Sequence, residues 1–266
     1  MTVYTESFFD ERKQGSYNSA KKIIPLILEL AQPKSVIDVG CGTGTWLSVF
    51  KEYGIEDIVG VDGDWVDSQF LEIPEHNFMP KDLTKPLELN RQFDLVVSLE
   101  VAEHLDSECA DKFVDALVKL GSLFLFSAAI PFQGGRGHVN EQWSEYWIKR
   151  FNDRECVGID CIRDKIWNNP NIKWWYSQNI LLFVREECLP NYPLLQLELQ
   201  KREGFHLMSN LVHPTNYLKK CKKYAKAIKS KDKELEKTRL KLNQTEIELQ
   251  KAQDQLEKLL LDNKTD

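Results

Sequence analysis

The sequence predicts an α/β fold in which an open, mostly parallel β-sheet is covered by helices and is followed by a C-terminal coiled coil. Short runs that are apolar on both faces alternate with helical patterns between residues 35 and 184, as in a sheet buried between two helical layers. A glycine-rich segment joins the first run to the helix after it. Near the C-terminus, leucines recur every seven residues, which is the spacing of a coiled-coil seam.

The composition is that of a globular chain with a sizeable core. Of the 266 residues, 42% are hydrophobic and 29% are charged, and the mean hydropathy is -0.42. No apolar run approaches the roughly 18–20 residues that cross a bilayer, and the first residues lack the apolar stretch of a signal peptide, so we expect neither a membrane span nor a leader. Six cysteines without a CxxC pair predict a reducing, cytoplasmic location.

Changes in composition divide the chain into four segments. Residues 1–34 predict an N-terminal helical lid segment that ends near Pro33, and residues 35–189 predict the α/β domain. Residues 190–224 contain three prolines and are interpreted as a connector, whereas residues 225–266 contain neither Gly nor Pro and predict the coiled coil. The runs interpreted as strands are 35–39, 57–61, 93–99, 122–127 and 179–184.

The predicted coiled coil has leucine at the first core position of four consecutive heptads. These residues are Leu235, Leu242, Leu249 and Leu256, and the second core positions hold Thr238, Thr245, Ala252 and Leu259. We expect this seam to hold copies of the chain together as a homodimer or homotrimer. Two alternatives remain open: pairing through a competing stripe of Leu240, Ile247 and Leu261, or a lone exposed helix.

A candidate cofactor site begins at the glycine-rich segment VIDVGCGTGT, residues 36–45. Alternating glycines between a strand and a helix let the backbone bend and let a ligand approach closely. The segment departs from the GxGxxG dinucleotide fingerprint, because Gly44 comes one residue early. Asp62-Gly63 ends the next apolar run, where a carboxylate can accept hydrogen bonds from ribose hydroxyls. Asp82-Leu83 follows a third run, where an acid can face an adenine amine.

Together with FDLVVSLEVAEHL, these segments resemble the class I S-adenosylmethionine-dependent methyltransferases over about residues 15–185. The resemblance implies a Rossmann-like, seven-stranded sheet whose last strand is antiparallel. It also implies that the glycine loop faces the methionine part of the cofactor, that the acid after the second strand holds the ribose, and that the third segment borders the adenine. The cofactor residues it implies are Asp38, Gly40, Cys41, Gly42, Gly44, Asp62, Gly63, Asp82 and Leu83.

A cluster of acids and histidines follows the predicted fourth strand. Glu100 is followed by Glu103 and His104 at i+3 and i+4, so one helical turn would place all three on one face. His138 follows the predicted fifth strand, whose end neighbours that of the fourth. Such carboxylates and imidazoles are stabilised when a cation lies between them. We therefore predict that these four residues bind a divalent metal, Mn or Mg, although Fe, Co and Zn also suit mixed N/O ligands. The alternative is a Glu-His helix cap without metal.

The ExxEH segment with its later histidine resembles the small-RNA 3′-terminal 2′-O-methyltransferases and the quinone-biosynthesis O-methyltransferases. That resemblance implies a divalent ion that grips substrate oxygens. Such an ion lowers the pKa of an alcohol and orients its oxygen. Glu103, His104 and His138 are therefore the predicted catalytic residues, with one histidine taking the proton. Without an ion, a histidine would serve as a plain general base.

The segment after the predicted fifth strand carries the candidate substrate residues Arg136, Asn140 and Trp143. An indole beside polar side chains suits a sugar, whose faces are partly apolar. We expect an O-methyltransferase that acts on a sugar hydroxyl, in a vicinal diol of a glycan or a nucleotide sugar. A looser resemblance to methyltransferase domains found with glycan-assembly enzymes, some of them joined to coiled coils, favours the same acceptor.

Three other functions remain open. An RNA 3′-terminal 2′-O-methyltransferase would share the metal chemistry. However, residues 1–218 hold 21 basic and 32 acidic residues, a net charge of -11, which disfavours nucleic acid as a partner, although residues 219–266 carry +5. A quinone or phenol O-methyltransferase would need a more apolar pocket. A coiled-coil assembly protein could carry the cofactor fold as a remnant, but the intact glycine loop and acids argue against this.

Overall fold

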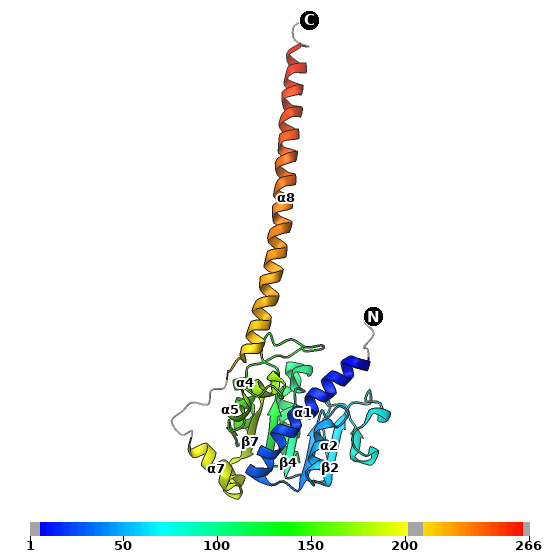
Figure 1. The fold of residues 1–266 in the computed structure, drawn as a ribbon, viewed down its shortest axis with the longest axis vertical. Helices are drawn as coiled ribbons and strands as arrows, with labels where there is room; N and C mark the ends of the chain where they lie inside the picture. The colour runs from blue at the N-terminus through cyan, green and yellow to red at the C-terminus, as the bar shows by residue number, and fades with distance from the viewer. Residues whose placement is uncertain (1–5, 202–209, 263–266) are drawn as a thin grey trace. The chain divides into compact units, whose positions relative to one another are not determined.

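The computed structural model describes residues 6–201 and 210–262, with side chains for 14–201 and 210–256. The chain forms two compact units, one ending at His213 and one beginning at Pro214 (Figure 1). The first unit is the α/β domain, and the second is one long helix.

A seven-stranded sheet with the strand order β3-β2-β1-β4-β5-β7-β6 forms the centre of the first unit. The strands β1 to β5 are parallel, whereas β7 runs antiparallel to both of its neighbours. The seven-stranded sheet with an antiparallel last strand is therefore confirmed. The strands are β1 Ser35–Val39, β2 Asp57–Asp62, β3 Phe78–Pro80, β4 Leu95–Leu99, β5 Leu123–Ser127, β6 Cys156–Ile159 and β7 Leu181–Arg185.

Helices cover both faces of this sheet, as the doubly apolar strands require. Side chains alternate along a strand, so in β4 Leu95 and Val97 join one core layer while Val96 joins the other. The helices α1 and α2 pack on the first layer and α3 and α4 on the second (Figure 1). The helices of this unit are α1 Glu6–Ala31, α2 Thr45–Glu52, α3 Ala110–Leu120, α4 Ser144–Asn152, α5 Arg163–Ile166, α6 Trp174–Asn179 and α7 Pro193–Gln200.

Prolines account for the main difference from the predicted segment boundaries. The predicted connector 190–224 contains the helix α7, and the long helix α8, Pro214–Asp262, begins before residue 225. Proline is tolerated in the first turn of a helix because the N–H it lacks has no partner there. Pro193 and Pro214 therefore begin helices, where the sequence analysis interpreted them as breaks.

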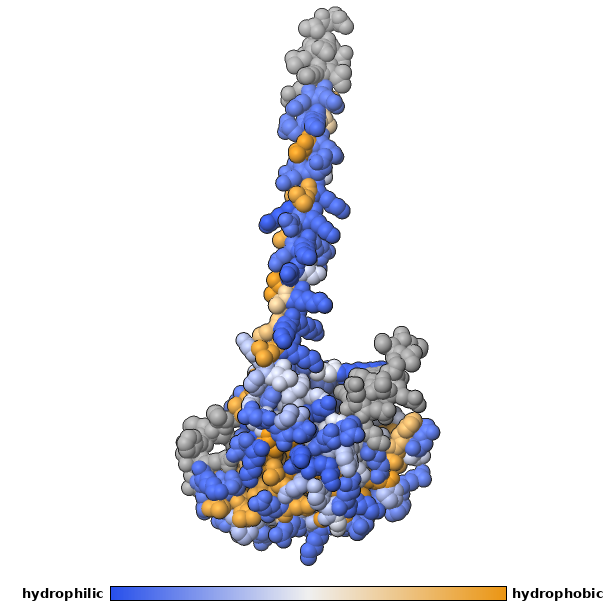
Figure 2. Space-filling model, viewed as in Figure 1, coloured by the Kyte–Doolittle hydropathy of each residue, from blue (hydrophilic) through white to orange (hydrophobic). Residues whose placement is uncertain are grey.

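In the helix α8 every side chain from Cys221 to Leu256 is exposed, whereas in its first turns Asn216 is buried and Lys220 is half-buried. Isolated apolar residues lie along a mostly hydrophilic surface in Figure 2. Among the described residues, no helix is both long enough and apolar enough to cross a bilayer.

Aromatic packing between α4 and the sheet offers a test of the core. The ring of Phe151 is fully buried and stacks on Phe183 with centroids 4.0 Å apart. We expect Phe151→Ala to lower the free energy of unfolding by about 3–5 kcal/mol, because it leaves a cavity in a close-packed layer. The exposed Phe70→Ala is the control and should change it by less than about 0.5 kcal/mol.

The measurement is tryptophan fluorescence during urea unfolding, since all seven tryptophans lie in the first unit. Equal effects of the two substitutions would contradict this view of the core.

Candidate active site

The glycine loop between β1 and α2 has a backbone that only glycine adopts without strain. Gly40, Gly42 and Gly44 have φ angles of 88°, 55° and 84°, all in the left-handed region. A Cβ on Gly40 would lie 2.3 Å from the Cγ2 atom of Val101, next to the turn that carries the histidine. A Cβ on Gly42 would meet no atom within 4 Å, so this part of the loop borders open space. The loop therefore has both the shape and the access that a bound ligand requires.

Buried carboxylates flank this loop at the ends of β1 and β2. The carboxylate of Asp62 accepts hydrogen bonds from the N–H groups of Gly42 and Gly63, both at 2.7 Å. Burial raises the pKa of Asp62, while those two N–H groups and His104 lower it. Burial, followed by repulsion from Asp62, raises the pKa of Asp38 to about 8. The edge of the sheet at the ends of β1 and β2 is thus short of positive charge, which suits a cationic ligand.

The thiol of Cys41 lies within the loop, in surroundings that disfavour its thiolate. Burial, together with Asp38 and Asp62, raises the pKa of this thiol far above its usual range. Its Sγ atom lies 3.4 Å from the carbonyl oxygen of Gly42. Cys41 therefore contributes to the shape of the loop rather than to bond making.

Glu72 supports the glycine loop from a distant segment that the sequence analysis missed. Its Oε1 atom accepts hydrogen bonds from the hydroxyls of Thr43, at 2.9 Å, and Thr45, at 2.5 Å. Its N–H donates to the carbonyl oxygen of Thr43 at 2.8 Å. Glu72 lies in an irregular segment between β2 and β3 without a strand or glycine motif, so no local signal marks it.

Asp82, the expected neighbour of adenine, lies exposed just after β3. Its Oδ1 atom accepts hydrogen bonds from the N–H of Thr84 at 3.0 Å and from its hydroxyl at 2.6 Å. These bonds, with Lys85, lower the pKa of Asp82. In the structure its carboxylate therefore organises a turn, and Leu83 beside it is half-buried.

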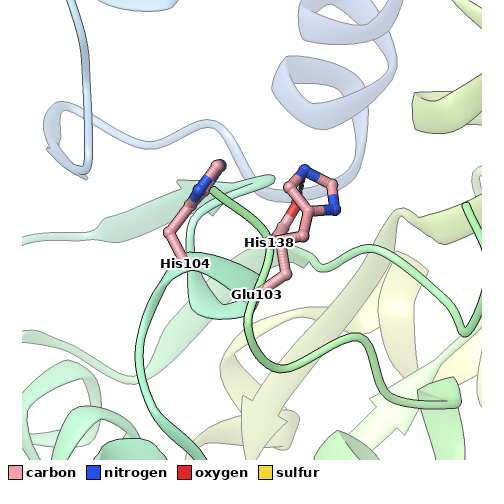
Figure 3. Close-up of side chains that lie close together, drawn as sticks. All are labelled: Glu103, His104 and His138. Carbon is pink, nitrogen blue, oxygen red and sulfur yellow. Dashed lines mark ion pairs between the residues drawn. The ribbon is translucent and has the colours of Figure 1, made fainter. Parts of the chain in front are cut away.

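Three of the four predicted metal ligands meet beyond the end of β4. Glu103 and His104 lie in the 3₁₀ turn Ala102–His104, and His138 reaches them from the segment that follows β5. One potential ligand atom from each lies within 4.8 Å of the others (Figure 3). The two imidazole rings meet edge to face with centroids 4.8 Å apart.

The carboxylate of Glu103 is fully buried, yet neither of its oxygens has a hydrogen-bond partner among the described residues. Burial, followed by repulsion from Glu100, raises its pKa well above the usual range. The N–H groups of Glu103 and Ala129 oppose this only in part. An unpartnered buried carboxylate is costly, and a cation at this position would remove that cost.

Both histidines are oriented by groups that can only accept a hydrogen bond. The Nδ1 atom of His138 lies 2.8 Å from Oε1 of Glu141, and that of His104 lies 3.2 Å from the carbonyl oxygen of Gly137. Because a carboxylate and a carbonyl oxygen accept hydrogen bonds, these contacts favour the neutral tautomer that carries its proton on Nδ1 and its lone pair on Nε2. The Nε2 atom of His138 lies 4.0 Å from Glu103. A carboxylate behind a histidine is common at metal sites.

The structure does not bring Glu100 into this cluster. Its φ of 58° is left-handed, and the 3₁₀ turn begins only at Ala102, so the expected helical face does not form. Its carboxylate instead accepts hydrogen bonds from Gln133, at 2.7 Å, and Asn179, at 2.9 Å. Burial raises the pKa of Glu100 to about 7, although these hydrogen bonds lower it. Glu100 therefore ties the segment after β5 to the end of α6.

The candidate substrate residues differ in exposure. Arg136 is exposed, and Trp143, at the start of α4, is 40% exposed. Asn140 is buried; its N–H donates to the carbonyl oxygen of Glu103 at 3.0 Å, and its Nδ2 atom has no partner among the described residues. Asn140 thus holds the backbone of Glu103 in place, and its burial leaves little of it for contact with a substrate.

Sequence reasoning also missed three residues around the cluster: Glu141, Gln133 and Asn179. Glu141 had a usable signal, since it follows His138 by three residues in HVNE. Gln133 and Asn179 come from segments far apart in the sequence, and only the assembled sheet brings them to Glu100.

Comparison with known proteins identifies the family. The profile of a family described as a methyltransferase domain matches residues 11–176, more than half of the chain. The chain belongs to the class I S-adenosylmethionine-dependent methyltransferases. For this methyltransferase the glycine loop and the buried acids at the sheet edge are the parts expected at the cofactor.

Two relatives of this methyltransferase are O-methyltransferases by name. The mitochondrial ubiquinone biosynthesis O-methyltransferase of Dictyostelium discoideum is 30% identical over 129 residues, 41% of this chain and 39% of that protein. The small RNA 2′-O-methyltransferase of Mus musculus is 27% identical over 125 residues, 40% of this chain and 31% of that protein. The matched region spans less than half of either relative.

Solved structures support the fold alone. The sugar N-methyltransferase KedS8 from a Streptoalloteichus species has a TM-score of 0.52 at 15% identity, covering 70% of this chain and 96% of that one. The magnesium protoporphyrin IX methyltransferase of Synechocystis, with bound S-adenosylmethionine, has a TM-score of 0.50 at 18% identity, covering 70% and 87%.

The glycine loop provides a direct test of cofactor binding. We expect Gly40→Ala to weaken S-adenosylmethionine binding by about a hundredfold or more, about 2.7 kcal/mol, because its Cβ would collide with Val101 and shift the loop. Gly54→Ala is the matched control, since Gly54 has a φ of 90° but no atom within 4 Å of a Cβ. Isothermal titration calorimetry gives the dissociation constants. Equal weakening by both substitutions would mean that backbone strain, and not the loop, controls binding.

Proposed function

We propose that this methyltransferase transfers the methyl group of S-adenosylmethionine to a sugar hydroxyl, with a divalent cation held by Glu103, His104 and His138. One observation carries the proposal: a fully buried carboxylate, without a hydrogen-bond partner among the described residues, lies beside two imidazoles. This cluster is close to the glycine loop, since a Cβ on Gly40 would lie 2.3 Å from Cγ2 of Val101, two residues before Glu103. The two curated relatives, both O-methyltransferases by name, favour oxygen as the acceptor atom.

The ligand set suits a divalent ion. One carboxylate and two imidazoles are a mixed O/N set that first-row ions such as Mn²⁺ accept, and Mg²⁺ is the abundant alternative. When bound, such an ion lowers the pKa of a substrate alcohol and orients its oxygen. Glu141 would hold His138 in the required tautomer, and Asn140 would fix the backbone of Glu103. Glu100 is left out, because Gln133 and Asn179 already occupy its carboxylate.

The proposed transfer is an in-line displacement. The hydroxyl oxygen of the acceptor forms a bond to the methyl carbon, the bond from that carbon to the sulfonium sulfur breaks, and S-adenosylhomocysteine leaves. With a cation held by both imidazole Nε2 atoms, the hydroxyl proton would pass to water. Without the ion an imidazole Nε2 would take it as a general base, and His104 is then the better acceptor, because it is exposed and can pass the proton to water, whereas the side chain of His138 is 12% exposed.

A sugar suits the surroundings better than the alternatives. Trp143 is 40% exposed and follows the polar residues Asn140, Glu141 and Gln142 in the sequence, a combination that suits a sugar face. The net charge of -11 on residues 1–218 disfavours an RNA 3′ end. A quinone or phenol remains the small-molecule alternative, and it would not need two neighbouring hydroxyls.

We also propose that residues 225–266 hold copies of the chain together. The apolar first core positions from Leu235 to Leu256 are all more than half exposed in a single chain. Self-association would cover this stripe.

Metal binding is tested with the histidines. After equilibration with Mn²⁺, elemental analysis of the native chain should show about one ion per chain, and the His104→Ala, His138→Ala double variant should show none. His76→Ala is the control, since His76 lies in the segment before β3 and belongs to no cluster of ligands among the described residues. If manganese and magnesium both fail to bind the native chain, the histidines remain only as general bases.

The acceptor is tested by matched pairs of sugars. With methyl-labelled S-adenosylmethionine, sugars that carry a vicinal diol should be methylated, and the deoxy analogues that lack one of the two hydroxyls should react at least about a hundredfold more slowly. An oligoribonucleotide with a 3′-terminal diol and its 2′-deoxy form test the RNA alternative in the same assay. Transfer to phenols alone would overturn the sugar proposal, whereas any transfer would exclude a pure assembly role.

A further inference from the structure

The heptad register of α8 extends upstream of the leucines. Counting back by sevens from Leu235, the first core positions are Ile228 and Cys221, and the second core positions are Lys231, Tyr224 and Tyr217. Ile228 is 62% exposed, Tyr224 50% and Tyr217 61%. We infer that α8 pairs with α8 of a second copy in a parallel, in-register, two-stranded coiled coil that runs from Tyr217 to Leu256. This inference rests on the self-association proposed above.

The threonines of the seam can be buried without cost to their hydroxyls. Thr238 donates its hydroxyl to the carbonyl oxygen of Glu234 at 3.0 Å, and Thr245 donates to that of Lys241 at 3.0 Å. A hydroxyl that is satisfied within its own helix needs no partner across the seam, so each threonine can present its methyl group there. The two polar core positions are thus compatible with a packed interface.

Charges beside the seam complement one another in the parallel, in-register arrangement. In such a pair the residue before each first core position faces the residue five positions later on the other helix. Glu234 then faces Arg239 of the partner subunit, and Lys241 faces Glu246 of the partner subunit. Both pairs are of opposite sign. Lys231, a cation at a second core position, already pairs with Glu234 of its own helix at 2.8 Å.

The competing stripe lies elsewhere on the helix. Leu240 is 66% exposed and Ile247 52%, but in the same heptad count both fall at the position opposite the seam. The residues three positions after them are Asn243 and Gln250, so this stripe has no second apolar row over that span. It therefore makes a poorer seam, and it supplies matched control variants.

Light scattering of the full chain tests the seam. We expect a mass of twice 31.0 kDa for the native chain. The Leu242→Lys, Leu249→Lys variant should have the mass of one chain, whereas Leu240→Lys, Ile247→Lys should keep the native mass. A reversed response would overturn the seam, and a mass of three chains would overturn the two-stranded state. A monomeric native chain would overturn self-association itself. Methyl transfer by the same sample is measured separately, so that a failure of the coiled coil can be told apart from a failure of the proposed enzymatic function.

Cys221 tests the orientation, because it is exposed and lies in the seam near the start of α8. In a parallel, in-register pair the two Cys221 thiols face each other, so oxidation with copper phenanthroline should yield a disulfide-linked dimer. Cys221→Ser should abolish it, and Ser230→Cys added to that variant, on the outer side of the helix, should not restore it. A dimer by mass that gives no cross-link would overturn the parallel register while leaving self-association intact.

Discussion

The burial of four carboxylates at one edge of the sheet is the constraint on which the site depends. Parallel strands end at the same edge, and the acids at the ends of β1 and β2 and just after β4 are therefore gathered there. Burial is the largest cause of the raised pKa of each of them: Asp38, Asp62, Glu100 and Glu103. Such a group is stable only if donors or cations compensate the lost hydration.

Two of the four acids accept hydrogen bonds from the chain itself, and the other two are the proposed ligand-binding acids. Asp62 accepts two backbone N–H groups, and Glu100 accepts the amides of Gln133 and Asn179. The pKa of Asp38 is raised by burial and by repulsion from Asp62, and no group among the described residues lowers it. The carboxylate of Glu103 accepts no hydrogen bond within the described parts of the chain. A sulfonium cofactor and a divalent cation would supply the two missing positive charges. The same electrostatic deficit thus links cofactor binding to the proposed metal.

The sequence predicted what depends on local pattern and missed what depends on assembly. Alternating apolar runs predicted β1, β2, β4, β5 and β7 but not β6, and the glycine spacing located the loop between β1 and α2. The place of Glu100 could not be predicted, because its left-handed backbone and its amide partners come from segments that meet only in the folded sheet. Glu72 was missed for the same reason. Pro193 and Pro214 were misread because proline ends some helices and begins others, and only the backbone decides.

The long helix makes the strongest case that the single chain is not the whole assembly. It spans 49 residues, yet its described side chains from Tyr217 to Leu256 are nearly all exposed. An isolated helix in water gains little from propensity alone, and most helices are stabilised by burying an apolar face. Neither fold nor catalysis of the first unit explains leucines at strict seven-residue spacing. The proposed pairing with an identical helix would supply the missing burial. A parallel pair would bring the N-terminal ends of the two helices to the same end of the coiled coil.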